Sequence, residues 1–236
     1  MTNATIVSIR EQTKDIRIFK VKMDEGQFDF QPGQFAMLEL DGIKRAYTIA
    51  SAPGLDYMEF IIILVQGGQL TTKIWKLNEG DRIGVMSRAF GHIKLSDIPA
   101  KAPLLLIATG TGIAMMRSVI QSGALSDRKI TLLSGARFAA DLGFKEEFSA
   151  IQNKNLTLVQ IASREPWRGH QGRLTSVFEN PKFNPVIQDP DPEDGTHIMI
   201  CGGAEMVDDM VAKFRDLGFT EANAANPSGN IHFEKY

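Results

Sequence analysis

An arginine and a tyrosine two positions apart are the first residues of this sequence whose types suggest ligand binding. Arg45 and Tyr47 follow a β-like segment that ends at the turn Asp41-Gly42. Alternate side chains of a strand share a face, so Arg45, Tyr47 and Ile49 are expected to project together. Guanidinium groups bind phosphate oxygens and phenol rings stack on flat rings, which together suit a planar ligand that carries phosphate. An ordinary surface strand with one arginine also fits this stretch.

A glycine pair precedes a second candidate site. Gly67-Gly68 leads into residues 70–77, whose apolar spacing predicts a short helix that starts near Thr71 and Thr72. Backbone N–H groups and hydroxyls at a helix start can bind a pyrophosphate. A plain capped helix that covers one end of a barrel also accounts for the pattern.

Three further arginines follow predicted strands in the second half of the chain. Arg137 comes after the strand predicted at residues 129–133, Arg164 follows the next strand beside Ser163, and Arg173 lies shortly beyond. An acidic residue after the second strand favours the ribose diol of NAD, whereas guanidinium groups favour a 2′-phosphate. The arginines therefore favour a site that binds NADPH in preference to NADH, although arginines are also common in surface loops.

The elements that carry these arginines predict an α/β domain. Residues 104–108 form a continuous apolar run, as in a strand buried on both faces, and the turn Gly110-Thr111-Gly112 follows. Strands then alternate with helices, which predicts a doubly wound parallel sheet with ligands at the carboxyl ends of its strands. Cys201, like the arginines, is predicted just after a strand. The predicted strands are 104–108, 129–133, 156–161 and 197–200, and the predicted helices are 115–122, 142–151 and 205–217.

The first half of the chain predicts an antiparallel β-barrel. Short apolar or alternating runs are separated there by turns rich in glycine, proline, aspartate and asparagine. A proline-flanked connector at residues 98–103 leads into the second half, so we predict a barrel domain over residues 1–99 and an α/β domain over residues 100–236. The predicted barrel strands are 4–9, 16–23, 34–40, 46–51, 57–65 and 81–86.

Composition argues against several classes of function. The 236 residues carry a net charge of −2, with 43% hydrophobic and 23% charged residues, so nothing points to nucleic acid. The four histidines are too scattered to predict a metal site, and the single cysteine excludes a disulfide framework or a cysteine-ligated iron–sulfur cluster within the chain. No signal-peptide pattern or membrane-length apolar run occurs. We expect a soluble cytoplasmic protein that binds neither nucleic acid nor membranes.

Taken in order, the motifs resemble the ferredoxin–NADP reductase family over essentially the whole chain. They are Arg45-Ala46-Tyr47-Thr48-Ile49-Ala50-Ser51, Gly68-Gln69-Leu70-Thr71, Gly110-Thr111-Gly112-Ile113-Ala114, Cys201-Gly202-Gly203 and Phe233-Glu234-Lys235-Tyr236. Residues 136–142, Ser163-Arg164-Glu165 and Gly172-Arg173-Leu174 resemble the bacterial branch of the family. The resemblance implies an FAD-binding barrel followed by an NADP(H)-binding domain, with hydride passing between nicotinamide and flavin.

The resemblance also implies roles for single residues toward FAD. Arg45 would bind the pyrophosphate and Tyr47 would pack on the isoalloxazine. Thr48, where many members have a serine, would act near flavin N5, and Tyr236 would cover the flavin face and move for nicotinamide to enter. The other residues implied to bind FAD are Ala46, Ile62, Ile63, Leu64, Gln69, Leu70 and Thr71.

The remaining implied roles concern NADP(H). Cys201 and Glu234 would orient the nicotinamide and assist hydride or proton movement, which makes them, with Thr48, the implied catalytic residues. Thr111 would lie near both cofactors. The implied 2′-phosphate site is Arg137, Ser163, Arg164 and Arg173, and Gly110, Gly112 and Gly202 complete the cofactor-binding set.

Three functions follow, of which the first is the leading prediction. It is a monomeric, NADPH-dependent reductase with bound FAD that exchanges electrons with a ferredoxin or flavodoxin. The second is an NAD(P)H:flavin reductase with flavin as a diffusing substrate, against which the implied contacts on both sides of the pyrophosphate argue. The third is a reductase subunit that docks onto an oxygenase complex, whose partner would have to carry its own iron–sulfur cluster.

Overall fold

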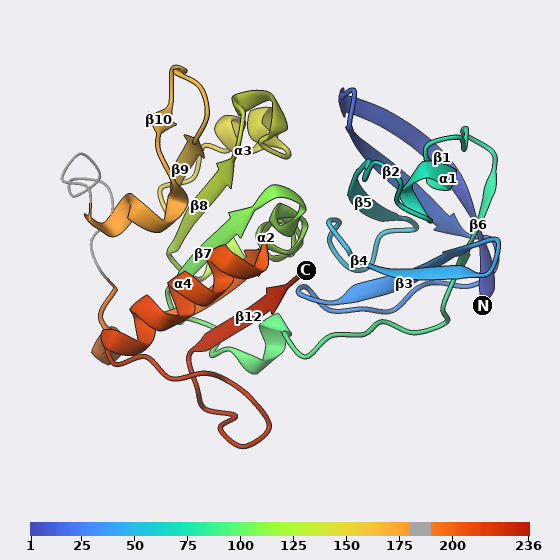
Figure 1. The fold of residues 1–236 in the computed structure, drawn as a ribbon. Helices are drawn as coiled ribbons and strands as arrows, with labels where there is room; N and C mark the ends of the chain where they lie inside the picture. The colour runs from blue at the N-terminus through green and yellow to red at the C-terminus, as the bar shows by residue number, and fades with distance from the viewer. Residues whose placement is uncertain (180–189) are drawn as a thin grey trace.

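A computed structural model describes residues 1–179 and 190–236 of the chain. Figure 1 shows two domains side by side, each built on a six-stranded sheet, with the C-terminus between them. Among the described residues, no helix combines the length and the apolar character needed to cross a membrane.

The N-terminal domain is antiparallel throughout, in the strand order β4-β3-β6-β1-β2-β5. Its inward side chains, among them Phe19, Leu38 and Phe60, form one apolar core. Just after β4, the backbone N–H of Ala50 donates to the Glu59 carbonyl in β5 at 2.7 Å, so the two ends of the sheet meet. The predicted antiparallel fold is confirmed. Its elements are β1 (Thr2–Thr13), β2 (Ile16–Met23), β3 (Phe35–Leu40), β4 (Ile43–Thr48), β5 (Met58–Ile63), α1 (Thr71–Ile74) and β6 (Arg82–Val85).

The C-terminal domain is a parallel sheet in the order β10-β9-β8-β7-β11-β12, covered on both faces. In β7, Leu104 and Leu106 pack with α2, whereas Leu105 and Ile107 pack with α4, as expected of a strand buried on both faces. The predicted doubly wound α/β fold is confirmed. Its strands are β7 (Leu104–Thr109), β8 (Ile130–Ala136), β9 (Leu156–Ala162), β10 (His170–Gln171), β11 (His197–Gly202) and β12 (Ile231–Lys235).

Three α-helices and six 3-10 turns complete the described elements. The strand order reverses between β7 and β11, which is where doubly wound sheets bind ligands. The helices are α2 (Ile113–Gln121), α3 (Lys145–Ala150) and α4 (Ala204–Asp216). The 3-10 turns are η1 (Leu95–Asp97), η2 (Gly110–Gly112), η3 (Ala124–Ser126), η4 (Ala139–Asp141), η5 (Leu174–Glu179) and η6 (Pro192–Asp194).

Two predicted elements of the barrel domain have different bounds in the structure. The strand predicted at 46–51 is β4, which begins directly after the left-handed Asp41-Gly42 turn and ends at Thr48. The following residues bend toward β5. The helix predicted at 70–77 has only four α-helical residues, because Lys76 and Leu77 donate to carbonyls three residues back, which tightens the chain into turns.

Two further differences concern the C-terminal domain. Cys201 lies within β11 rather than after it, and the sheet has two short edge strands, β10 and β12, that the sequence pattern did not predict. In the β11–β12 pair, Cys201 lies opposite Glu234. Two of the three predicted catalytic residues, Cys201 and Glu234, are therefore neighbours across one strand pair.

The two domains share an apolar interface. Ile16, Ile18 and Ile61 of the barrel belong to the same buried cluster as Ile113 and Phe144 of the α/β domain. This contact fixes the carboxyl edge of the parallel sheet against β5. The boundary at residues 99 and 100 stays a prediction.

Candidate cofactor-binding clefts

Two cavities meet at the domain interface. The barrel cleft, of about 430 Å³, lies along β4, β5 and the chain before α1. The sheet-edge cleft, of about 770 Å³, lies over the carboxyl ends of β7, β8 and β9. Both sizes are typical of small-molecule sites. The residues that line both clefts, and so mark where they join, are Ile61, Ile63, Thr111 and Tyr236.

The polar end of the barrel cleft pairs Arg45 with the loop before α1. Arg45 Nη2 donates to Gln69 Oε1 at 3.4 Å, while its Nη1 donates to the Lys44 carbonyl at 2.7 Å. The Arg45 side chain is solvent-accessible, so it can exchange these contacts for phosphate oxygens. This arrangement suits a pyrophosphate held between β4 and the loop.

The threonine hydroxyls at the start of α1 are already bonded to the protein. Thr71 Oγ1 accepts from the Val65 N–H at 3.2 Å, and Thr72 Oγ1 donates to the Gly68 carbonyl at 2.6 Å. Neither hydroxyl is free in this conformation, and the expectation that they face an anion stays a prediction. They stabilise the turn that presents Gln69.

Tyr47 lies beside Arg45 on the wall of the barrel cleft. Burial raises the pKa of Tyr47 to about 12, and the charge of Arg45 opposes that shift only in part. The phenol is therefore neutral at physiological pH and presents a flat ring with a polar tip, which suits stacking on an aromatic ligand.

The barrel cleft also holds a half-buried carboxyl group, that of Glu234, and the buried thiol of Cys201. Burial raises the pKa of Glu234, and His92 only partly opposes it. Within the described part of the chain, Glu234 Oε2 is buried without a hydrogen-bond partner. Burial and the charge of Glu234 raise the pKa of the Cys201 thiol, which is therefore un-ionised at neutral pH. An unpartnered buried oxygen beside a neutral thiol suits a ligand that brings its own N–H donors, as a carboxamide does.

Tyr236 closes the junction. Its hydroxyl donates to the Thr109 carbonyl at 2.8 Å and accepts from the Gly112 N–H at 3.3 Å, while its backbone N–H donates to the Gly202 carbonyl at 3.2 Å. The side chain is nevertheless 64% exposed. Its hydroxyl holds the side chain against the glycine turn, so these hydroxyl hydrogen bonds must break for the ring to move away.

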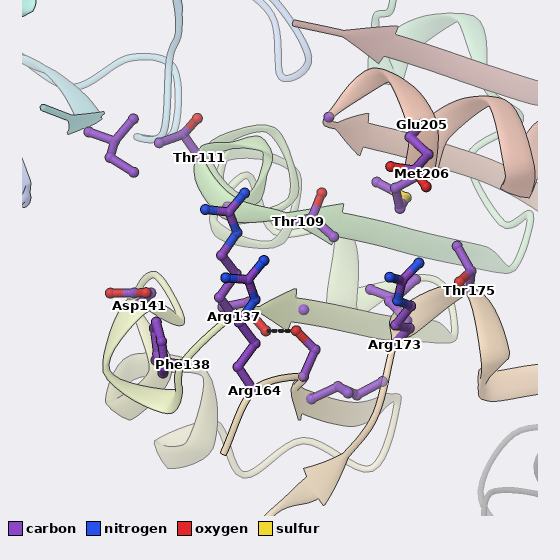
Figure 2. Close-up of a pocket in the computed structure, with 18 of the residues that line it drawn as sticks. Thr109, Thr111, Arg137, Phe138, Asp141, Arg164, Arg173, Thr175, Glu205 and Met206 are labelled. Carbon is purple, nitrogen blue, oxygen red and sulfur yellow. Dashed lines mark hydrogen bonds between the residues drawn. The ribbon is translucent and has the colours of Figure 1, made fainter. Parts of the chain in front are cut away.

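Arginines surround the sheet-edge cleft. Figure 2 shows Arg137, Arg164 and Arg173 reaching into it from the chain after β8, after β9 and before η5. The backbone N–H of Arg164 donates to the Arg137 carbonyl at 2.9 Å, which ties the first two loops together. Ser163 Oγ donates to the Ala136 carbonyl at 3.4 Å. Three solvent-accessible guanidinium groups around one cavity suit a doubly charged phosphate.

The structure brings most of the predicted site residues onto the cleft walls. Three lie elsewhere. Leu64 follows β5 and donates its N–H to the Asp15 carbonyl. Gly112 and Gly202 are packing positions, because an added Cβ would lie 2.2 Å from the Cys201 carbonyl oxygen or from Thr109 Oγ1, respectively. The predicted residues on the walls are Arg45, Ala46, Tyr47, Thr48, Ile62, Ile63, Gln69, Leu70, Thr71, Gly110, Thr111, Arg137, Ser163, Arg164, Arg173, Cys201, Glu234 and Tyr236.

Sequence reasoning missed other wall residues. Asp15 reaches the sheet-edge cleft from the β1–β2 hairpin, and Glu205 and Met206 reach it from the start of α4. Only tertiary packing brings these residues there. Phe138 also lines the cleft and is 43% exposed. Its position directly after Arg137 was a usable signal, because an exposed aromatic ring beside a phosphate site can stack on a nucleotide base.

Comparison with known proteins agrees with this geometry. The family model of the oxidoreductase FAD-binding domain matches residues 3–95, and that of the oxidoreductase NAD-binding domain matches residues 106–212. The chain is similar to the flavodoxin/ferredoxin–NADP reductase of Escherichia coli, with 31% identity over 81% of this chain and 82% of that protein. It is 34% identical to the ferredoxin–NADP reductase of Azotobacter vinelandii, over 87% of this chain and 86% of the relative.

A solved structure extends the comparison to the whole fold. The ferredoxin NADP+ reductase of Neisseria gonorrhoeae, crystallised with bound FAD and NADP, superposes with a TM-score of 0.89 at 27% identity. The match covers 99% of this chain and 98% of that one. With the relatives above, it shows that this chain belongs to the ferredoxin–NADP reductase family.

Proposed function

We propose that this protein transfers electrons between NADP(H) and a ferredoxin or flavodoxin through bound FAD. The observation that carries the proposal is the junction of the two clefts, where Thr111 and Tyr236 line both. A flavin in the barrel cleft and a nicotinamide nucleotide in the sheet-edge cleft would meet there. Ferredoxin and flavodoxin are proposed as the electron carriers because the similar reductases are named for them.

The barrel cleft fits FAD. Arg45 and Gln69 would hold the pyrophosphate, and Tyr47 would stack on the ring system with Thr48 beside it. Bound FAD supplies hydride and single-electron chemistry that no side chain can provide. The protein holds the ring against the junction and limits the access of water.

The sheet-edge cleft fits NADPH. Arg137, Arg164 and Arg173 would bind the 2′-phosphate, and their positive charge is the basis of preference over NADH. Glu234 would accept hydrogen bonds from the carboxamide, with Cys201 packed beside it as a neutral thiol. Tyr236 would leave the glycine turn to admit the nicotinamide.

The experiment that tests this function follows electrons from NADPH to a carrier. Purified protein should retain FAD through gel filtration and, under anaerobic conditions, reduce added flavodoxin or ferredoxin at the expense of NADPH. A protein that loses all flavin yet reduces free flavin would instead support the flavin reductase. Monomeric state and cytoplasmic location stay predictions, which sedimentation and cell fractionation would check.

A further inference from the structure

A buried arginine links the two domains close to the cleft junction. Arg117 lies in α2 and is only 6% exposed. Its Nη1 donates to Glu59 Oε2 at 2.6 Å and to the Ala50 carbonyl at 2.9 Å, and both acceptors belong to the barrel domain. The next residue, Ser118, donates from Oγ to the Ser51 carbonyl at 2.7 Å. Three hydrogen bonds thus cross from one helix to two adjacent segments of the barrel.

The other side of the same guanidinium group is bonded within its own domain. Arg117 Nε donates to both carboxylate oxygens of Glu147 in α3, at 2.9 and 3.0 Å. Its Cζ lies 4.3 Å from the centre of the Phe144 ring. Arg117 therefore makes one ion pair across the interface and one within the α/β domain, and the two can be removed separately.

The acceptors in the barrel continue the chain that lines the flavin cleft. Ala50 and Ser51 lie two and three residues after Thr48. They are fixed in turn to β5, because the Ala50 N–H donates to the Glu59 carbonyl at 2.7 Å and the Glu59 N–H donates to Ser51 Oγ at 3.1 Å. Arg117 thus holds a rigid segment rather than a free loop.

The helix that carries Arg117 also carries the nicotinamide side of the junction. α2 begins directly after η2, whose central residue is Thr111, a wall residue of both clefts. The series of contacts from Thr48 to Thr111 therefore runs through Ala50 and Arg117. It connects the walls of the two clefts.

We propose that Arg117 is a positioning residue for hydride transfer, a role that rests on the proposed function. By bonding Ala50 and Glu59 it holds Thr48 and Thr111 at the separation that brings the two rings together. The competing interpretation is that Arg117 only stabilises the contact between the two domains. A buried ion pair adds little net stability over apolar residues of the same size, although removal of one partner alone is destabilising. Small misplacement of reacting groups costs about 100-fold in rate for 1 Å.

The test compares two ion pairs of the same guanidinium group. Arg117→Lys keeps the charge but cannot reach all its acceptors. Glu59→Gln weakens the interdomain pair and, with it, the longer ion pair between Glu59 Oε1 and Lys20 Nζ within the barrel, at 3.9 Å. Glu147→Gln weakens only the pair within the α/β domain and is the matched control. Each FAD-loaded variant is mixed with NADPH in an anaerobic stopped flow, and the saturating rate of flavin bleaching is recorded with the dissociation constant for NADP+.

Arg117→Lys and Glu59→Gln should slow bleaching about 10- to 100-fold, with FAD content and NADP+ affinity within about twofold of wild type. Glu147→Gln should bleach at the wild-type rate. As a readout apart from turnover, amide hydrogen exchange at residues 45–51, measured without NADPH, should quicken in the first two variants and not in the control.

The outcomes separate this proposal from the proposed function. Folded, FAD-loaded Arg117→Lys that bleaches at the wild-type rate overturns the positioning role alone. Equal slowing of bleaching by Glu147→Gln overturns it too, because the ion pair across the domain interface would then matter no more than the pair within the α/β domain. Wild-type protein that NADPH cannot bleach removes both proposals. If Arg117→Lys does not fold, Ser118→Ala removes one neutral hydrogen bond of the same interface and should slow bleaching about threefold, as the loss of about 0.7 kcal/mol predicts.

Discussion

Substitution of Gly112 by alanine is expected to damage both stability and hydride transfer. Gly112 has φ of −59° and ψ of −17°, which alanine adopts freely, so backbone strain plays no part. The added Cβ would lie 2.2 Å from the Cys201 carbonyl oxygen, 2.5 Å from the Cys201 carbonyl carbon and 3.0 Å from the Gly202 nitrogen. All three atoms belong to the backbone of β11, which is paired on both sides by β7 and β12.

The size of the effect follows from this geometry. Relief of the clash from 2.2 Å to the 3.4 Å of ordinary contact requires 1.2 Å of movement, and the paired strand cannot supply it. The start of α2 must move instead. Overpacking of this kind costs about 1–3 kcal/mol, and we expect the upper end. For a chain of this length, about 3 kcal/mol lowers the melting temperature by roughly 6–12 °C.

The same movement displaces the turn that forms the junction. Gly112 donates to Tyr236 Oη, and Thr111 precedes it directly, so both would shift by about 1 Å. A shift of that size should lower the rate of flavin bleaching by NADPH about 100-fold.

The assay is thermal unfolding of wild type and variant at the same saturating concentration of FAD. Bound ligand raises the melting temperature, so its concentration must be equal in the two samples. Gly203→Ala is the stability control: nothing lies within 4 Å of its added Cβ, and its φ is −62°. It should lose no more than about 1 kcal/mol, the cost of alanine at a helix N-cap. A Gly112→Ala protein as stable and as fast as wild type would refute the reasoning.

Three further predictions concern the arginines, the C-terminal tyrosine and a buried histidine. Arg137→Ala and Arg164→Ala should each raise the KM for NADPH about 10- to 100-fold and leave that for NADH within about twofold, because a charged hydrogen bond contributes about 1.5–3 kcal/mol. Arg168→Ala, whose side chain is outside both clefts, is the kinetic control, and equal losses with NADH would contradict the site. Tyr236→Ser should tighten NADP+ binding about tenfold in a spectroscopic titration, because two hydrogen bonds no longer hold a ring over the junction; weaker binding would contradict this. Burial and the neighbouring His197 lower the pKa of His232 from 6.5 to about 4, so only the unfolded chain takes up this proton as pH falls from about 6.5 to about 4. The free energy of unfolding should therefore fall over that interval. Measured by urea unfolding, this fall should be smaller in His232→Asn than in wild type, by up to about 3 kcal/mol. An equal fall in both proteins would contradict the assignment.

Local patterns in the sequence were sufficient for the two domains and much of the cleft. The apolar run of β7 predicted a strand buried on both faces, because each of its side chains packs against one of two helical layers. The positions of Arg137 and Arg164 directly after strands placed them at the sheet edge, since parallel strands share one carboxyl end. In these cases the relevant information lies within a few residues along the chain.

Long-range contacts set what the sequence did not predict. Asp15 reaches the sheet-edge cleft because the β1–β2 hairpin extends to the other domain, where Gln12 Nε2 donates to the Leu142 carbonyl at 3.0 Å. Arg117 sits in an apolar helix, and nothing nearby in the sequence indicates its partner Glu59. β12 is a short edge strand whose pairing with β11 decides its structure.

The most direct measurement of the central claim is an anaerobic absorbance titration of the purified protein with NADPH and, separately, with NADH. We predict a bound flavin band that NADPH bleaches efficiently and NADH bleaches poorly. This result would support the FAD cleft and the arginine site together. Equal bleaching by both nucleotides would contradict the 2′-phosphate site. A colourless protein that takes up no added FAD would contradict the account as a whole.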